Sequence, residues 1–295
     1  MELPLSALFT NWDIPPAVSL ALALVATLYT IGWTRVRRTR PEQLSRRHLV
    51  AFLAGIVSIF VAVSSPLDTF SESLLFMHMG QHYVLMSIAP PLLVLGAPIV
   101  PLLRGLPRGL IRNILRPFFR RRLFHAAGSI LTRPVVAWIA MNTAYVGWHI
   151  PAAYEFALSS EGWHNLEHAC FLFTSILFWW PVIHPWPSRR PWMQLIAVPY
   201  LAGADLVNTA VSAFLCFSGK LIYPSYAHVN RPFPINPLTD QMAAGAFMWV
   251  LGSIVFLIPV AVIMVHSLSG RVSMGTTRAA SSADIIHAEQ PAFLQ

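Results

Sequence analysis

Residues 74–98 read LLFMHMGQHYVLMSIAPPLLVLGAP, and no Asp, Glu, Lys or Arg interrupts these 25 positions. About 20 mostly apolar residues form a helix that is long enough to cross the hydrocarbon core of a bilayer. Further apolar stretches extend this to seven expected transmembrane helices, at about 17–34, 49–65, 74–98, 134–151, 163–183, 193–217 and 241–266. The sequence therefore predicts an all-α integral membrane protein. Its seven-helix bundle would occupy residues 1–270, followed by a mobile cytoplasmic tail at 271–295.

The overall composition supports a membrane protein. Of the 295 residues, 56% are hydrophobic and only 11% are charged, whereas a soluble domain carries about 25% charged residues. The net charge of +8 does not indicate nucleic acid, because 18 of the 20 Lys and Arg fall in short links between the apolar stretches. We therefore expect neither a soluble enzyme nor a nucleic-acid-binding protein.

The basic residues also predict how the helices are oriented. Short cytoplasmic links are enriched in Lys and Arg. The links after the first and third expected helices carry six and eight arginines, whereas the links on the opposite side hold only Lys220 and Arg231. We therefore expect the N-terminus outside and the C-terminus in the cytoplasm. In the eight-arginine link an Arg recurs every fourth residue from Arg104 to Arg120, which favours contact with anionic lipid headgroups.

Three of the expected helices carry histidines to the same outer end. His78 and His82 are four residues apart in one helix, and His164 and His168 repeat this spacing in another. Each pair therefore shares one helix face. His149 lies at the outer end of the helix between them and adds a fifth imidazole. Imidazole is a good ligand for copper, zinc, iron and nickel, so we predict a metal site formed by all five histidines.

Other side chains could complete or support this site. Methionine thioethers suit Cu(I), although two methionines that are two residues apart point to different sides of a helix. Acidic residues inside a span are costly and tend to face a bundle interior or a cavity. One of them lies near the middle of the sixth span, and another could simply be the N-terminal acid of the seventh helix. The candidates of both kinds are Met77, Met79, Met86, Glu167, Asp205 and Asp240.

Five ordered motifs resemble the CtaG-like family of cytochrome c oxidase assembly factors, the polytopic family rather than the single-span copper chaperone. They are HMGQHYVLMSIAPPLLVLGAP from His78, GWHIPAAYEFAL from Gly147, HNLEHACFLFTSILFWWPV from His164, LIYPSYA from Leu221 and DQMAAGAFMW from Asp240. The resemblance covers about residues 50–265. It implies a protein of the bacterial cytoplasmic membrane that helps to mature a haem–copper oxidase. It further implies copper as the metal, and an oxidase subunit and a periplasmic copper carrier as partners.

A non-enzymatic copper chaperone, with Cu(I) as the expected form of the metal, is thus the leading hypothesis. A membrane haem protein is an alternative, because histidines on facing helices can bind iron axially, but this leaves the paired spacing unexplained. A copper transporter is a second alternative, with the methionines and Asp205 along its path. An enzyme is not expected, because no nucleophile and base occur at a recognisable spacing and no phosphate-binding loop is present.

Overall fold

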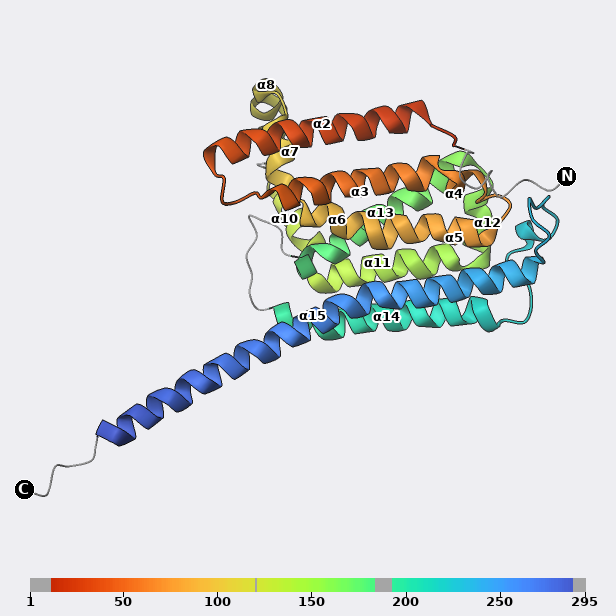
Figure 1. The fold of residues 1–295 in the computed structure, drawn as a ribbon. Helices are drawn as coiled ribbons and strands as arrows, with labels where there is room; N and C mark the ends of the chain where they lie inside the picture. Colours follow the sequence, from red (N-terminus) through yellow and green to blue (C-terminus); the bar gives the residue numbers. More distant parts are fainter. Residues whose placement is uncertain (1–11, 120, 184–192, 289–295) are drawn as a thin grey trace, which may run out of the picture.

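The described part of the chain is entirely helical. The computed structural model describes residues 12–119, 121–183 and 193–288, and no strand occurs within these ranges. The long helices are α2 (Pro16–Thr39), α3 (Arg46–Ser64), α11 (Pro134–His149), α13 (Glu161–Ile183), α14 (Met193–Phe217) and α15 (Pro237–Ala288) (Figure 1). Between α3 and α11, a further long segment consists of α5 (Leu75–Tyr83), the π-helix η1 (Val84–Ile88) and α6 (Ala89–Leu95). These elements confirm the prediction of an all-α bundle.

Five helical segments are long and apolar enough to cross a membrane. They are Pro16–Thr39, Arg46–Thr69, Glu161–Ile183, Ile196–Phe217 and Pro237–Val265. Leu75–Leu95 makes a sixth when it is taken together with α7 (Ile99–Gly105), from which it is separated by a bend of 72°. The remaining predicted span is α11, whose 16 residues extend about 24 Å, less than the roughly 30 Å of a hydrocarbon core. Length and composition therefore support five or six spans.

Large apolar side chains cover the outside of the bundle. Leu20, Val135 and Leu206 are at least 70% exposed, and Phe173 and Phe217 are exposed to a similar degree. Soluble proteins avoid contiguous apolar surface of this kind. In lipid, apolar side chains can face the solvent, provided that the backbone N–H and C=O groups form hydrogen bonds within the protein. The surface therefore agrees with a protein that lies in a membrane.

Helix α2 approaches α7 closely enough for direct backbone contact. A Cβ atom on Gly32 would lie 1.7 Å from the carbonyl oxygen of Pro101, and one on Gly105 would lie 2.0 Å from the carbonyl oxygen of Leu28. Only glycine fits such an approach. Arg35 adds a hydrogen bond from its guanidinium to the carbonyl oxygen of Arg104 at 2.6 Å. These contacts hold the bend that follows α6.

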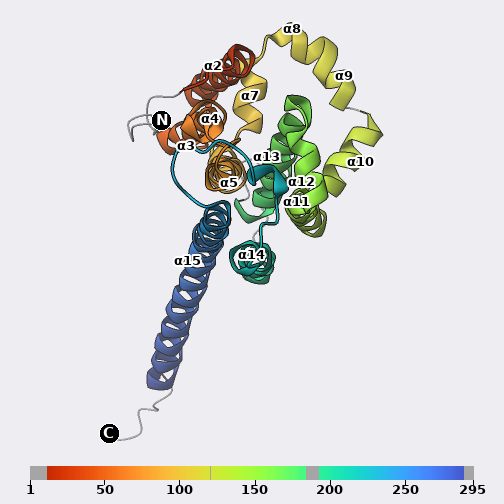
Figure 2. The same ribbon diagram turned by 90° about the vertical axis from the view of Figure 1, so that its right-hand side faces the viewer.

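The two ends of the bundle differ in their residues. Helices α5 and α13 begin at the right-hand end in Figure 1, and α3 and α11 end there. The other end carries the arginine-rich link, which forms α7, α8 (Arg108–Leu110), η2 (Ile111–Leu115), α9 (Arg116–Phe119) and α10 (Arg122–Leu131). Figure 2, viewed along the bundle from the right-hand end, shows α8, α9 and α10 in an arc at the periphery. All five predicted histidines therefore belong to the end opposite the arginine-rich link.

Candidate metal centre

Four of the five predicted histidines form one cluster. Each of His78, His82, His164 and His168 offers a ring nitrogen, and these four nitrogens all lie within 4.8 Å of one another. The Nε2 atoms of His78 and His82 are only 2.9 Å apart. His164 is partly exposed, whereas the other three are buried. The spacing of four residues on α5 and on α13 thus brings two histidine pairs together, as the sequence predicts.

The four-histidine cluster has dimensions that suit a single metal ion. Around an ion with metal–nitrogen bonds of about 2.1 Å, as in zinc sites, two ligand nitrogens lie at most about 4.2 Å apart. The observed limit of 4.8 Å is close to this value. The Nε2 atoms of His164 and His168 are buried and find no hydrogen-bond partner among the described residues. Buried polar atoms are rarely left unpaired, so these two nitrogens are available to an ion.

Three tyrosines support the cluster from the side of α12 (Pro151–Leu158) and η3 (Pro224–Tyr226). Tyr226 Oη lies 3.2 Å from His78 Nδ1 and donates to the carbonyl oxygen of Ser71 at 2.7 Å. Tyr154 Oη is 3.0 Å from Tyr226 Oη. Tyr223 donates to the carbonyl oxygen of His149 at 3.0 Å. Sequence reasoning missed these tyrosines, because neither GWHIPAAYEFAL, which holds Tyr154, nor LIYPSYA, which holds Tyr223 and Tyr226, places a tyrosine in a metal-ligand pattern.

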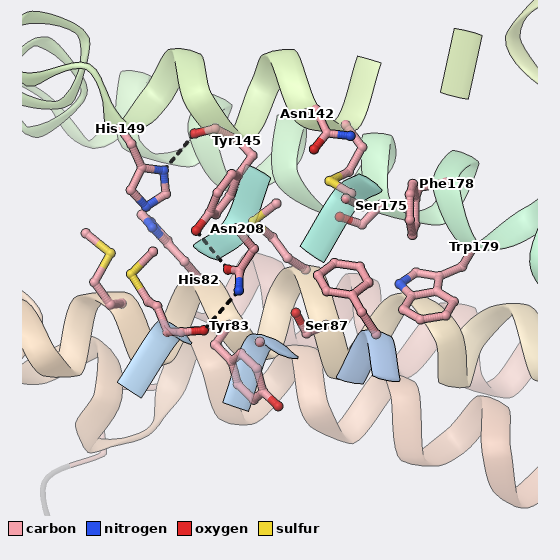
Figure 3. Close-up of a pocket in the computed structure, with 17 residues that line it drawn as sticks. His82, Tyr83, Ser87, Asn142, Tyr145, His149, Ser175, Phe178, Trp179 and Asn208 are labelled. Carbon is pink, nitrogen blue, oxygen red and sulfur yellow. Dashed lines mark hydrogen bonds between the residues drawn. The ribbon is translucent and has the colours of Figure 1, made fainter. Parts of the chain in front are cut away.

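His149 lies beside the four-histidine cluster rather than within it. Its Nδ1 donates to the carbonyl oxygen of Tyr145 at 2.7 Å, and its Nε2 is buried without a hydrogen-bond partner among the described residues. The ring centroids of His82 and His149 are 6.4 Å apart. Figure 3 shows the nitrogens of these two rings directed toward each other. His149 therefore lies next to His82 but outside the four-histidine cluster.

Glu167 places a carboxyl group against the cluster. The side chain is fully buried, and its Oε1 lies 3.8 Å from His82 Nε2. Neither carboxyl oxygen has a hydrogen-bond partner among the described residues. Burying a carboxylate without a partner is costly. A cation among the imidazoles would remove that cost.

The two aspartates from the sequence prediction have different positions. Asp240, on α15, accepts hydrogen bonds from the backbone N–H groups of Leu75 at 2.7 Å and Phe76 at 3.1 Å. It thereby caps the start of α5, the helix that carries His78 and His82. Asp205 is not among the residues whose ligand atoms gather within 4.8 Å in the described structure. Asn208, one turn further along α14, instead accepts a hydrogen bond from Tyr145 Oη at 3.0 Å.

The methionines also separate into two groups. Met79 and Met86 line a cavity beside His82 and His149. Met77 packs on the other side of α5, in an apolar cluster that includes Phe70, Leu74 and Phe233. Helix geometry predicts this separation, since residues two positions apart face different directions.

Comparison with known proteins gives one family and a few relatives. The family model for the cytochrome c oxidase caa3 assembly factor matches residues 27–269. An uncharacterized protein of Mycobacterium leprae is 25% identical over 246 residues, which are 82% of this chain and 37% of the relative. Uncharacterized proteins of Mycobacterium bovis and Mycobacterium tuberculosis are each 26% identical over 262 residues, 85% of this chain and 39% of theirs. The chain thus spans less than half of each of these relatives. No solved structure matches it significantly.

Proposed function

Because the chain belongs to the cytochrome c oxidase caa3 assembly factor family, we propose that it binds copper and supplies it to the copper centre of a haem–copper oxidase. The observation that carries the proposal is the group of four imidazole nitrogens within 4.8 Å on two facing helices. The family supports a role in assembly rather than in catalysis. The copper is then a cargo that the protein passes on.

The ligand chemistry favours copper over other metals. Imidazole binds copper, zinc, iron and nickel alike, but methionine thioethers are soft ligands that select Cu(I). Met79 and Met86 line the cavity beside the cluster, and His82 and His149 line the same cavity. Residues with thioether side chains, which suit Cu(I), are therefore present next to the imidazole cluster. A monovalent ion also matches the single carboxyl group of Glu167.

Two alternatives receive less support from the geometry. In a haem protein one histidine from each of two facing helices holds iron from opposite faces of a porphyrin, which would leave the other two of the four gathered ring nitrogens without a role. A copper transporter needs ligands along a path to the cytoplasm. Within the described residues, the four-histidine cluster is the one group of at least three His, Cys, Asp or Glu side chains that could hold a metal ion.

The orientation of the protein in the membrane determines which partners can reach the site. We propose a multi-pass protein of the bacterial cytoplasmic membrane, with the N-terminus outside and the C-terminus in the cytoplasm, because arginines concentrate at one end of the bundle. In this orientation the histidine end faces outward. A periplasmic copper carrier could then load the cluster, and an oxidase subunit in the same membrane could receive the ion.

Metal analysis of the purified protein tests this function. We expect copper in the wild-type protein and its loss from the double variant His78→Ala, His164→Ala, which removes one ligand from each helix. His228→Ala is the control, because this histidine is exposed and lies outside the cluster. Unchanged copper in the double variant would contradict the assignment of the site. An absorption spectrum of the same sample separates the alternatives, since a Soret band would indicate haem.

A further inference from the structure

The histidines of the four-histidine cluster lie in two layers. His78 and His164 form the outer layer, and their ring centroids are 5.0 Å apart. His82 and His168 form the inner layer, with ring centroids 5.3 Å apart. Helices α5 and α13 both begin at the histidine end of the bundle (Figure 1), and four residues of helix advance about 6 Å. The inner layer therefore lies about one helical turn deeper than the outer layer.

The two histidines of the outer layer differ in exposure. His78 is fully buried, because the ring of Tyr154 lies beside it with a centroid distance of 5.2 Å and Tyr226 Oη lies 3.2 Å from its Nδ1. His164 is partly exposed, and residues 159–163 directly before it are all exposed. The other three histidines of the cluster are buried. His164 is therefore the member of the cluster that lies at the surface.

The position of His164 in its helix does not by itself explain this exposure. His164 is the fourth residue of α13, and His78 is likewise the fourth residue of α5. The first turn of α5 is nevertheless covered by α12 and η3, which carry Tyr154 and Tyr226. The packing around the two helices, rather than their ends, thus leaves one side of the outer layer uncovered.

No hydrogen bond to the described residues fixes the ring of His164. Its Nε2 is buried and unpaired in this part of the chain, and the ring packs beside that of His168 with a centroid distance of 4.2 Å. His78, in contrast, is held by the hydroxyl of Tyr226. Side chains at the surface change rotamer within nanoseconds. The His164 ring can therefore turn outward without breaking a hydrogen bond to the described residues.

A buried acidic group lies beside the inner layer. Oε1 of Glu167 is 3.8 Å from His82 Nε2, and neither carboxyl oxygen has a hydrogen-bond partner among the described residues. Attraction between opposite charges is stronger in a protein interior than in water. A cation that has reached the outer layer is therefore drawn further in, away from the exposed ring of His164.

We propose that His164 is the ligand through which copper enters and leaves the four-histidine cluster. The inference rests on the proposed handling of copper by this chain. One bond between copper and its carrier breaks as the bond to His164 forms, and copper keeps its oxidation state. The ion then moves to the inner layer, and the steps run in reverse when the oxidase receives it. The three buried histidines hold the ion but do not meet the partner.

The rate of copper loading tests this proposal. Metal-free protein is mixed with Cu(I) bound to a chromophoric chelator, which stands in for the carrier, and the absorbance of the chelator complex reports the transfer. His164→Ala should slow loading about tenfold, within the range over which association rates vary among variants of one binding surface. His168→Ala, which removes the other ligand of α13, is the matched control. It should load at the wild-type rate and release copper faster. Equal loading rates in the two variants would overturn the proposal.

Chemical modification of the wild-type protein provides a second measurement that needs no variant. Diethyl pyrocarbonate reacts with accessible imidazoles, and mass spectrometry locates the products. In the metal-free protein His164 should react together with the exposed His228, whereas His78, His82 and His168 should be spared. Bound copper should protect His164 but not His228.

The outcomes of the modification experiment separate the inference from the proposed function. If His164 does not react in the metal-free protein, or still reacts in the copper-loaded protein, it is not the ligand of entry. The four-histidine cluster could then still bind copper, and the proposed function would stand. A protein that binds no copper would overturn both.

Discussion

The hydroxyl group of Tyr226 determines which nitrogen of the His78 ring carries the hydrogen. Burial raises the pKa of the Tyr226 hydroxyl, so the group stays protonated and has one hydrogen to donate. The carbonyl oxygen of Ser71 can only accept, and it takes that hydrogen at 2.7 Å. His78 Nδ1, at 3.2 Å from the same hydroxyl, must then be the donor. The neutral ring therefore keeps its Nε2 lone pair toward the other histidines.

Replacing Tyr226 by Phe should weaken metal binding at the four-histidine cluster. The substitution removes the hydroxyl that lies 3.2 Å from His78 Nδ1 but none of the four ligands. Loss of such a supporting partner typically lowers metal affinity about 10–100-fold. Competition with a chromophoric Cu(I) chelator would measure the change.

Tyr200→Phe is the matched control for this prediction. Tyr200 is also buried, and its hydroxyl donates to the carbonyl oxygen of Phe178 at 3.0 Å. It does not contact the described cluster through any hydrogen bond. The control should keep wild-type affinity. Equal affinities in the Tyr226 and Tyr200 variants would show that the tyrosine does not orient His78.

Residues differ in how far the sequence predicts their roles. The two histidine pairs were predictable, because a spacing of four residues places both rings on one helix face. This spacing can be read from a short stretch of sequence. Tyr226 was not, since 148 residues separate it from His78. Nor could the sequence place His149 outside the cluster, because the position of its ring depends on the bond to Tyr145 and on the packing of α11 against α13.

At the scale of elements, the start of α15 determines the start of α5. The first backbone N–H groups of a helix have no partner within it, and Asp240 supplies two acceptors to those of Leu75 and Phe76. The next residue, Gln241, accepts from Ile222 N at 2.7 Å and donates to the carbonyl oxygen of Lys220 at 3.1 Å. The DQ pair therefore fixes a histidine helix and the loop that leads to Tyr226.

Asp240→Ala should destabilise the bundle by about 1–2 kcal/mol, the usual cost of losing a helix N-terminal cap. Thermal unfolding in detergent would measure it, and copper affinity should fall in parallel, because the first turn of α5 lies just before His78. Glu72→Ala removes an exposed acid close to the same end of α5 and should leave the unfolding temperature unchanged. If both variants unfold at the same temperature, the cap does not support the helix.

Apolar length predicted the long helices well but not their interruptions. Each predicted span overlaps an observed helix, since the length of an apolar stretch is a local property. The bend that follows α6 is different. Ala97 adopts a positive φ of 49° there, a conformation that non-glycine residues rarely take. The contact of Gly32 and Gly105 with the opposing backbones supports the bent arrangement. No local sequence pattern predicts this bend.

For the whole molecule, the separation of arginines from histidines is the main asymmetry. The arginine-rich elements from α7 to α10 lie at one end of the bundle, and the four-histidine cluster lies toward the other (Figure 1). Basic residues mark the cytoplasmic side of membrane proteins. The proposed function requires this asymmetry, since the metal must be reachable from the side on which the carrier and the oxidase's copper centre are expected.

Labelling of single cysteines tests the orientation. Both native cysteines, Cys170 and Cys216, are first replaced by Ser. Ser159→Cys then places a thiol in an exposed position at the histidine end, and Gly109→Cys places one in α8, where a Cβ meets no atom within 4 Å. In intact spheroplasts a membrane-impermeant maleimide should label position 159 and spare 109 until the membrane is permeabilised. The reverse pattern would place the four-histidine cluster on the cytoplasmic side. Copper would then have to come from inside the cell, and delivery from a periplasmic carrier would be ruled out.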